Sequence, residues 1–224
     1  MFARNYARYY DKLNKRKPYQ REIDFVYLWG ECPKKILDIG CGTASYWKYF
    51  PPHVKIMGLE PSKAMRALSP HKNLIIPEYA EDIACLTENR RFMEIIGTAD
   101  AVYALFNVVN YMLFHNWWYQ IPVKPGGYFI FDVYDYDKME KERFKKTVRH
   151  IGGVKRTITP KEVDRKRAIL NISIEAEGRK FSEEHHLYLY DHSDINRYCH
   201  NNFEIVDEVS TPTWQKWYKL RRIK

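Results

Sequence analysis

Long apolar runs are missing from this sequence. None of its segments reaches the roughly 18 consecutive apolar residues that a helix needs to cross a bilayer. The first ten residues are too polar for a signal peptide. The four cysteines are scattered, without the two-residue spacing of a metal or redox pair. We therefore expect a soluble, cytoplasmic protein with reduced thiols, no bound metal and no membrane partner.

Acidic residues are in the minority, since 28 Asp and Glu stand against 37 Lys and Arg and the formal net charge is +9. Such an excess suggests an anionic partner, for example nucleic acid or a phosphorylated metabolite. The basic residues are spread along the chain, however, and the sequence has no zinc-finger pattern, RNA-recognition signature or long basic tail. Nucleic acid is therefore an alternative partner and not the favoured one.

Strand-like and helix-like segments alternate through the first part of the chain. Short apolar runs, typical of strands buried in a parallel sheet, occupy 35–39, 54–59, 74–77, 101–106 and 128–133. Helical patterns fall between them at 43–49, 62–68 and 108–118. This alternation predicts an α/β fold with a Rossmann-like, doubly wound, mostly parallel sheet.

Two further segments flank this pattern. Residues 1–31 have helical spacing and predict an N-terminal helical cap. After Tyr134 a basic helical piece at 138–144 precedes three period-two segments at 148–159, 168–176 and 181–190. We interpret 136–192 as an inserted antiparallel β lid within a single domain that spans 1–224. A helix at 194–200 and strands at 203–209 and 214–221 then complete a seven-stranded sheet whose last strand is antiparallel.

A glycine turn with an acidic residue ahead of it follows the first predicted strand. Gly40 and Gly42 let the backbone turn tightly and approach a ligand. A dinucleotide would place its diphosphate here, so the carboxylate of Asp38 argues against an NAD-dependent oxidoreductase. A cofactor that carries an ammonium and a sulfonium would instead be attracted. Glu60, at the end of the second strand, can accept hydrogen bonds from both hydroxyls of a ribose.

These residues resemble the first motif of class I S-adenosylmethionine-dependent methyltransferases. The resemblance implies that Asp38 and Gly40 lie near the methionyl end of the cofactor, and that Asp82 reaches the adenine amino group. Ala44 and Glu81 depart from the pattern, because many members have glycine at these two positions. The cofactor contacts that we expect are Tyr10, Tyr19, Asp38, Gly40, Cys41, Gly42, Glu60, Pro61, Met65, Glu81, Asp82, Ile83, Leu105 and Phe106.

A narrower resemblance comes from Tyr9, Tyr10, Asp11, Tyr19 and Glu22 together with the β insertion. Both features resemble those of glycine N-methyltransferase-like enzymes and sugar N,N-dimethyltransferases, which act on small molecules. The resemblance implies that Tyr10 and Tyr19 close over the methionyl part of the cofactor. Packing under the first helix is the alternative role for these tyrosines.

The acceptor site is expected where the fourth strand ends. Asn107, Asn110 and Tyr111 follow that strand without the two prolines with which nucleic-acid amino methyltransferases grip a flipped base. Helix capping is the alternative role for Asn107. His185 and His186 alternate on a predicted strand, so only one of them can face a pocket. As catalytic candidates we name Tyr10, Asn110, Tyr111 and His186.

The favoured hypothesis is therefore methyl transfer from S-adenosylmethionine, with S-adenosylhomocysteine as product, to a small molecule, at nitrogen. A neutral amine needs little beyond alignment, whereas an oxygen nucleophile needs a base or a metal. Two alternatives stay open. One is a methyltransferase that acts on RNA or protein, and the other is a catalytically silent protein that binds the cofactor and regulates a partner. A monomer and a homodimer are both compatible with the sequence.

Overall fold

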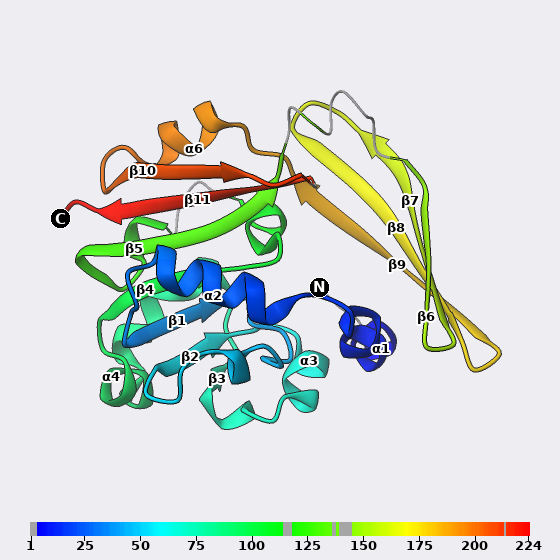
Figure 1. The fold of residues 1–224 in the computed structure, drawn as a ribbon, viewed down its shortest axis with the longest axis horizontal. Helices are drawn as coiled ribbons and strands as arrows, with labels where there is room; N and C mark the ends of the chain where they lie inside the picture. Colours follow the sequence, from blue (N-terminus) through cyan, green and yellow to red (C-terminus); the bar gives the residue numbers. More distant parts are fainter. Residues whose placement is uncertain (1–3, 114–117, 136–137, 139–144, 213) are drawn as a thin grey trace.

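The computed structural model describes residues 4–113, 118–135, 138, 145–212 and 214–224. Its larger sheet has seven strands in the order β10-β11-β5-β4-β1-β2-β3 (Figure 1). The strands are β1 (Lys35–Ile39), β2 (Lys55–Leu59), β3 (Ile75–Ile76), β4 (Ala99–Ala104), β5 (Val123–Tyr134), β10 (Phe203–Ser210) and β11 (Gln215–Arg222). Strands β1 to β5 pair in parallel, whereas β11 is antiparallel to both neighbours. The predicted Rossmann-like fold with an antiparallel last strand is confirmed.

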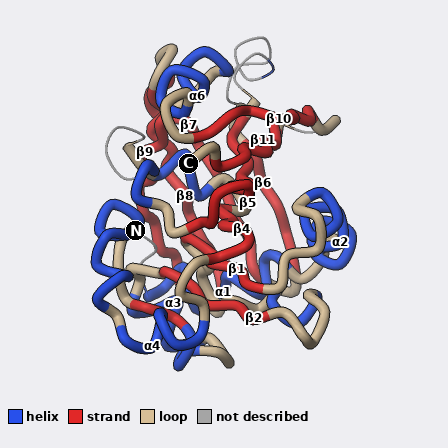
Figure 2. Tube along the Cα trace, turned by 90° about the vertical axis from the view of Figure 1, so that its left-hand side faces the viewer, coloured by secondary structure: helices blue, strands red, loops and turns tan. Residues whose placement is uncertain are grey.

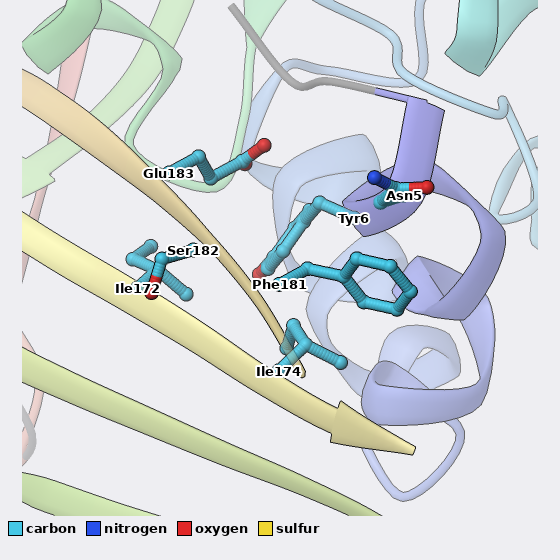
Figure 3. Close-up of a pocket in the computed structure, with 7 residues that line it drawn as sticks. All are labelled: Asn5, Tyr6, Ile172, Ile174, Phe181, Ser182 and Glu183. Atoms are coloured by element: carbon cyan, nitrogen blue, oxygen red, sulfur yellow. The ribbon is translucent and has the colours of Figure 1, made fainter. Parts of the chain in front are cut away.

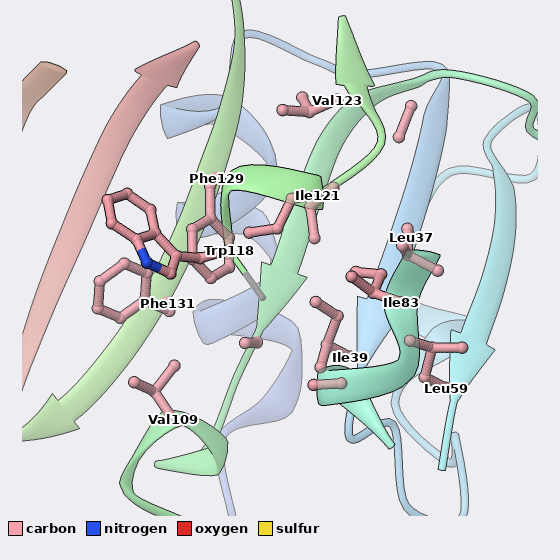
Figure 4. Packing of buried hydrophobic residues seen from close by; sticks show 14 of the residues in the cluster. Leu37, Ile39, Leu59, Ile83, Val109, Trp118, Ile121, Val123, Phe129 and Phe131 are labelled. Atoms are coloured by element: carbon pink, nitrogen blue, oxygen red, sulfur yellow. The ribbon is translucent and has the colours of Figure 1, made fainter. Parts of the chain in front are cut away.

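Both faces of this sheet are covered, because successive side chains of a strand point to opposite faces. On β1, Leu37 belongs to one buried cluster and Ile36 to the other. The first cluster includes Trp118, Phe129 and Phe131 (Figure 4) and packs against α4 (Arg90–Ile95) and α6 (His192–Cys199). The second packs against α2 (Tyr19–Trp29). Figure 2 shows α2 on one side of the strands and α4 and α6 on the other. The core is thus the doubly wound one that the sequence predicts.

Two predicted helices are largely wrong. Within 43–49, only a short 3₁₀ turn forms, η1 (Trp47–Tyr49), because Ala44 has a left-handed φ of 53° that no α-helix contains. Within 108–118, the described residues form η4 (Val108–Tyr111) and the first residue of η5 (Trp118–Gln120), and 114–117 lie outside the described part. The helix predicted at 62–68 is confirmed as α3 (Lys63–Leu68), with Ser62 as its N-cap. A 3₁₀ segment, η3 (Ala80–Glu88), and a short turn, η2 (Lys72–Leu74), complete this half.

The insertion forms a separate antiparallel sheet of four strands, not the three predicted. They are β6 (Thr147–Ile151), β7 (Val154–Val163), β8 (Arg167–Ala176) and β9 (Arg179–Tyr188), paired in that order. Gly152 and Gly153 have φ of 55° and 77° and turn the chain inside the segment predicted as one strand. Pro160, just beyond the first of these predicted segments, belongs to β7 beside a register shift. The helical piece predicted at 138–144 lies, apart from Lys138, outside the described residues.

The first helix, α1 (Arg4–Asn14), lies against this second sheet and away from α2 (Figure 1). Its buried side chains Tyr6, Tyr9 and Leu13 pack against residues of β7 and β8, Val154 and Ile172 among them. The predicted helical cap is therefore split. One helix covers the large sheet, and the other joins the β insertion.

Candidate functional site

One cavity of about 530 Å³ lies where β1, β2 and β4 end. The carboxyl edge of a parallel sheet is the usual ligand site of such folds. The wall is completed by α1, by the loop after β4 and by the insertion sheet. Predicted site residues that line it are Tyr10, Gly40, Cys41, Gly42, Glu60, Pro61, Met65, Glu81, Leu105, Phe106, Tyr111 and His186. The structure thus brings these residues together around one space.

The turn after β1 requires glycine at its first bend. Gly40 has φ of 67°, and a Cβ there would lie 2.5 Å from Cγ1 of Val108. Gly42 also has a left-handed φ, 60°, but its nearest neighbour, Cε of Met65, is 3.7 Å from an added Cβ. The backbone N–H groups of Gly40 and Cys41 donate to the carbonyl of Leu59 on β2 (2.8 and 3.1 Å). These bonds hold the turn over the end of β2, and Gly40, Cys41 and Gly42 all line the cavity.

Asp38 is buried behind this turn and does not line the cavity. Its Oδ2 accepts hydrogen bonds from the hydroxyl of Tyr46 and from Nε1 of Trp47 (both 2.5 Å). Its Oδ1 is buried and has no hydrogen-bond partner in the structure. Burial raises the pKa of Asp38 to about 7, although the two donors lower it. A buried acceptor without a donor fits a cationic ligand nearby, since such a charge would stabilise the carboxylate.

Glu60 is also buried, and it connects the glycine turn to α3. Its Oε2 accepts from the N–H of Gly42 (2.9 Å) and its Oε1 from the N–H of Ser62 (2.7 Å). Burial raises the pKa of Glu60, and these backbone bonds oppose the shift. A carboxylate has about four lone-pair sites, so Glu60 can still accept hydrogen bonds from ribose hydroxyls in the cavity. Its position fits the adenosine part of the cofactor.

Ala44, the departure from the motif, has the left-handed backbone that glycine favours. Alanine keeps this conformation at a cost of about 1 to 2 kcal/mol. The structure therefore explains why glycine suits this position and shows that alanine preserves the turn.

Helix α1 is tied to the same turn. Oδ1 of Asp11 accepts from the hydroxyls of Thr43 (2.7 Å) and Ser45 (3.1 Å). Tyr10, one residue earlier, lines the cavity. Tyr19 does not line it, and its ring instead stacks on Tyr46 (6.0 Å between centroids). Of the two predicted tyrosine lids, only Tyr10 is in the cavity wall of this structure.

The loop after β4 is held by a buried carboxylate. Phe106 and Asn107 have left-handed φ of 69° and 62°, and their N–H groups donate to Oδ1 and Oδ2 of Asp132 (2.5 and 2.9 Å). Burial raises the pKa of Asp132 to about 6. The ammonium of Lys17 lies 3.1 Å from the centre of the Phe106 ring and lines the cavity, and burial lowers its pKa. Helix capping by the Asn107 side chain is not seen.

The predicted acceptor residues separate into different roles. Asn110 is fully buried outside the cavity wall, where its amide donates to the carbonyl of Tyr188 (2.6 Å) and accepts from the N–H of Tyr134 (3.0 Å). Tyr111 lines the cavity and its hydroxyl lies 2.9 Å from Nδ1 of His185. Asn110 therefore positions the strand ends, and Tyr111 faces the space.

The two histidines of β9 face opposite ways, as strand alternation predicts. His185 is 3% exposed, whereas the His186 side chain is 65% exposed and pairs with Glu184 (2.9 Å). Both nevertheless line the cavity, so the prediction that only one of them can face a pocket is wrong, and His185 is the one buried beside Tyr111. The choice of His186 over His185 therefore selected the more exposed neighbour, because alternation alone does not say which face is inside.

Two predicted adenine contacts lie outside the cavity wall. Ile83 is part of the buried core, and Asp82 interrupts η3 with non-helical φ and ψ. Their neighbour Glu81 does line the cavity. Three further wall residues from distant parts of the chain had no signal in the sequence, namely Lys17, Tyr134 and Arg156.

A smaller hollow of about 40 Å³ adjoins the main cavity, with Tyr6 and Ile172 common to both walls. Figure 3 shows Tyr6 of α1 facing Phe181 and Ile174 of the insertion sheet. The contact between α1 and this sheet thus has an apolar centre with little internal space, and the polar residues Asn5, Ser182 and Glu183 complete the wall of the hollow.

Three structural observations concern metal binding, membrane spans and cysteine pairing. Among the described residues, no three His, Cys, Asp or Glu side chains gather in a way that could hold a metal ion. No helix in the described ranges combines the length and apolarity of a membrane span. All four cysteines are unpaired, with Cys41 and Cys199 buried.

The fold is similar to that of solved S-adenosylmethionine-dependent methyltransferases. A methyltransferase of this kind from Clostridium acetobutylicum superimposes with a TM-score of 0.71 at 22% identity, over 97% of this chain and 98% of its own. DesVI from Streptomyces venezuelae gives 0.73 at 16% identity, over 99% of both chains. CalS10, an amino pentose methyltransferase from Micromonospora echinaspora with bound S-adenosylmethionine, gives 0.67 at 19% identity, over 99% and 98%. The sequence matches no family model and no curated protein.

Proposed function

We propose that this protein is a methyltransferase that transfers the methyl group of S-adenosylmethionine to a nitrogen atom of a small molecule. The shared fold supports the cofactor, and the relatives CalS10 and DesVI cover almost the whole chain. Glu60 offers a hydrogen-bond acceptor in the cavity wall, and Asp38 adds a carboxyl group with an unpartnered Oδ1 behind the glycine turn.

The observation that carries the proposal is the continuity of the cavity. The same space touches Gly42 and Glu60 at the sheet edge and Tyr111 and His185 at the insertion. Its volume of about 530 Å³ is in the range of pockets that enclose small molecules. A donor at one end would therefore face a small acceptor at the other, under the roof formed by α1.

The chain's contribution follows from the chemistry. When bound, the cofactor supplies an electrophilic methyl group on a positively charged sulfur. The transfer is an in-line displacement, so the protein must align the two reactants and exclude water. We propose that residues 1–31 and the insertion at 136–192 act as cap and lid for this purpose. The hydrogen bonds between Asp11 and the glycine turn support the role of the N-terminal segment as a cap. The packing of α1 on β7 and β8 supports the role of the insertion as a lid.

The first experiment is calorimetry of the full chain with S-adenosylhomocysteine and, separately, with NAD. We expect binding of the first and not of the second, because Asp38 repels a diphosphate. The reverse result would remove the basis of the proposal.

The second experiment follows radiolabelled methyl transfer from S-adenosylmethionine to a panel of small amines, amino sugars included, and to RNA. Transfer to an amine that changes little between 50 and 200 mM salt supports the proposal. Transfer to RNA that falls steeply with salt would favour the nucleic-acid alternative. Tight cofactor binding without transfer to any acceptor would favour the silent regulator.

A further inference from the structure

A hydrogen-bonded chain of three side chains reaches the acceptor end of the cavity. Nε2 of His185 lies 2.7 Å from Oε1 of Glu183, and Nδ1 of the same ring lies 2.9 Å from the hydroxyl of Tyr111. Glu183 and His185 come from β9, and Tyr111 comes from η4 after β4. The chain therefore joins the insertion sheet to the large sheet at the site itself.

The chemistry of the partners fixes the direction of the hydrogen bonds. An ionised carboxylate only accepts, so Nε2 of His185 donates to Glu183. In the neutral ring Nδ1 then has a lone pair and accepts from the hydroxyl of Tyr111. A phenolic oxygen can accept while it donates, so Tyr111 can receive a proton donor from the cavity.

Exposure separates the roles of the three groups. Tyr111 is 36% exposed, whereas His185 is 3% exposed, and both line the cavity. Tyr111 is thus the more accessible of the two side chains at the cavity wall, while its hydroxyl is buried against His185. Burial raises the pKa of Tyr111 well above its usual value, which keeps its hydroxyl protonated at neutral pH.

An aliphatic amine needs such a partner. Its ammonium form has a pKa of about 10, so only about one molecule in 10³ is a free amine at pH 7. A protonated nitrogen has no lone pair with which to attack a methyl group.

We propose that Glu183, His185 and Tyr111 form a proton relay that deprotonates the ammonium of the acceptor. This inference rests on the proposed function. The N–H bond of the ammonium breaks and its electron pair stays on nitrogen, while its proton passes to the oxygen of Tyr111. The hydroxyl proton of Tyr111 moves to Nδ1 of His185, and the carboxylate of Glu183 stabilises the resulting imidazolium. The proton leaves to water after turnover.

Other groups face the relay and set its field. Tyr6 and Tyr10 of α1, Tyr134 of β5 and Glu183 raise the pKa of Tyr111. The ring of Tyr6 lies 6.0 Å from that of His185, and Arg156 of β7 lies 3.5 Å from the Tyr6 hydroxyl. Among these groups, Arg156 carries a fixed positive charge. This charge disfavours a second positive charge on His185. The carboxylate of Glu183 is therefore required for the relay to accept a proton.

The hydrogen-bond chain can be tested on the full-length protein without any substrate. Side-chain ¹⁵N NMR of the histidines should show His185 as the tautomer protonated at Nε2. Glu183→Gln should change the Nε2 resonance of this ring, and Tyr111→Phe should change its Nδ1 resonance. The matched control His192→Gln, an exposed histidine of α6 paired with Glu208, should leave the His185 signals in place. Protonation of the neutral ring at Nδ1 would overturn the relay.

Proton transfer by the relay is tested by measuring kcat/KM as a function of pH, with an amine acceptor that the radiolabelled methyl-transfer assay has identified. His185→Gln should lower kcat/KM about 10²-fold at pH 7, the usual contribution of a general base. The loss should shrink to within about fivefold at pH 9.5, because about a quarter of the amine is then free in solution, against about one molecule in 10³ at pH 7. Tyr111→Phe, which keeps the ring, should behave alike. A loss that is the same at every pH in an active enzyme overturns the relay alone, and an inactive wild type that does not bind S-adenosylhomocysteine overturns the proposed function.

Discussion

Replacement of Asp38 by Asn should remove a pH dependence of cofactor binding. In the free protein the pKa of Asp38 is about 7 because the carboxyl is buried with one oxygen unpartnered. A bound ammonium or sulfonium would favour the ionised form, so binding should displace the proton. If only the ionised form binds tightly, the Kd at pH 6 should exceed that at pH 8 by about tenfold, and binding at pH 7 should release about half a proton.

Calorimetry with S-adenosylhomocysteine in buffers of different ionisation enthalpy measures both quantities. Asn can still accept from Tyr46 and Trp47 but does not titrate, so Asp38→Asn should bind more weakly with a flatter pH profile. The folding stability of the free protein should change with pH in the opposite direction to cofactor affinity. Because the pKa of Asp38 is higher in the folded chain than its ordinary 3.8, the folded chain holds the proton more tightly, and this contribution to stability is lost as pH rises from about 4 through about 7. Equal proton release by wild type and variant would refute the reasoning.

Three further outcomes follow from the site. Glu60→Ala should weaken S-adenosylhomocysteine binding by about 1 to 3 kcal/mol in calorimetry, since buried polar groups lose their acceptor, and unchanged affinity would contradict the ribose assignment. Gly40→Ala should lower the free energy of unfolding in urea by at least about 1 kcal/mol more than Gly126→Ala, because both have a left-handed φ but only Gly40 lacks room for a Cβ. Asp11→Ala should speed hydrogen exchange of the α1 amides about tenfold through loss of two hydrogen bonds to the glycine turn, and unchanged exchange would show that other contacts hold the helix.

Much of the large sheet could be predicted because its strands are buried on both faces. The bounds of β1 match the apolar run at 35–39, and the turn at Gly40 follows directly from it. Period alone could not find the end of β4. Its strand stops at Ala104 because Phe106 and Asn107 adopt left-handed backbone that Asp132, far along the chain, holds in place.

The site residues that directly follow a predicted strand could be predicted, whereas those that folding brings together from distant parts of the chain could not. Glu60 and Pro61 follow a strand whose end the sequence reveals. Lys17 of the loop between α1 and α2, Tyr134 of β5 and Arg156 of β7 are far apart in the sequence, and only the folded chain brings them to one wall. His185 illustrates the same limit, since its burial depends on which face of the insertion sheet meets η4.

Strand β11 protects the edge of β5, so the large sheet depends on the last part of the chain. This strand, made of residues near the C-terminal end, inserts between β5 and β10 and buries Trp217, Tyr218 and Leu220. A chain cut before residue 215 would leave a long, apolar edge on β5 with unpaired backbone groups, which is a template for aggregation. Expression trials should therefore leave this segment intact and place any solubility partner beyond it.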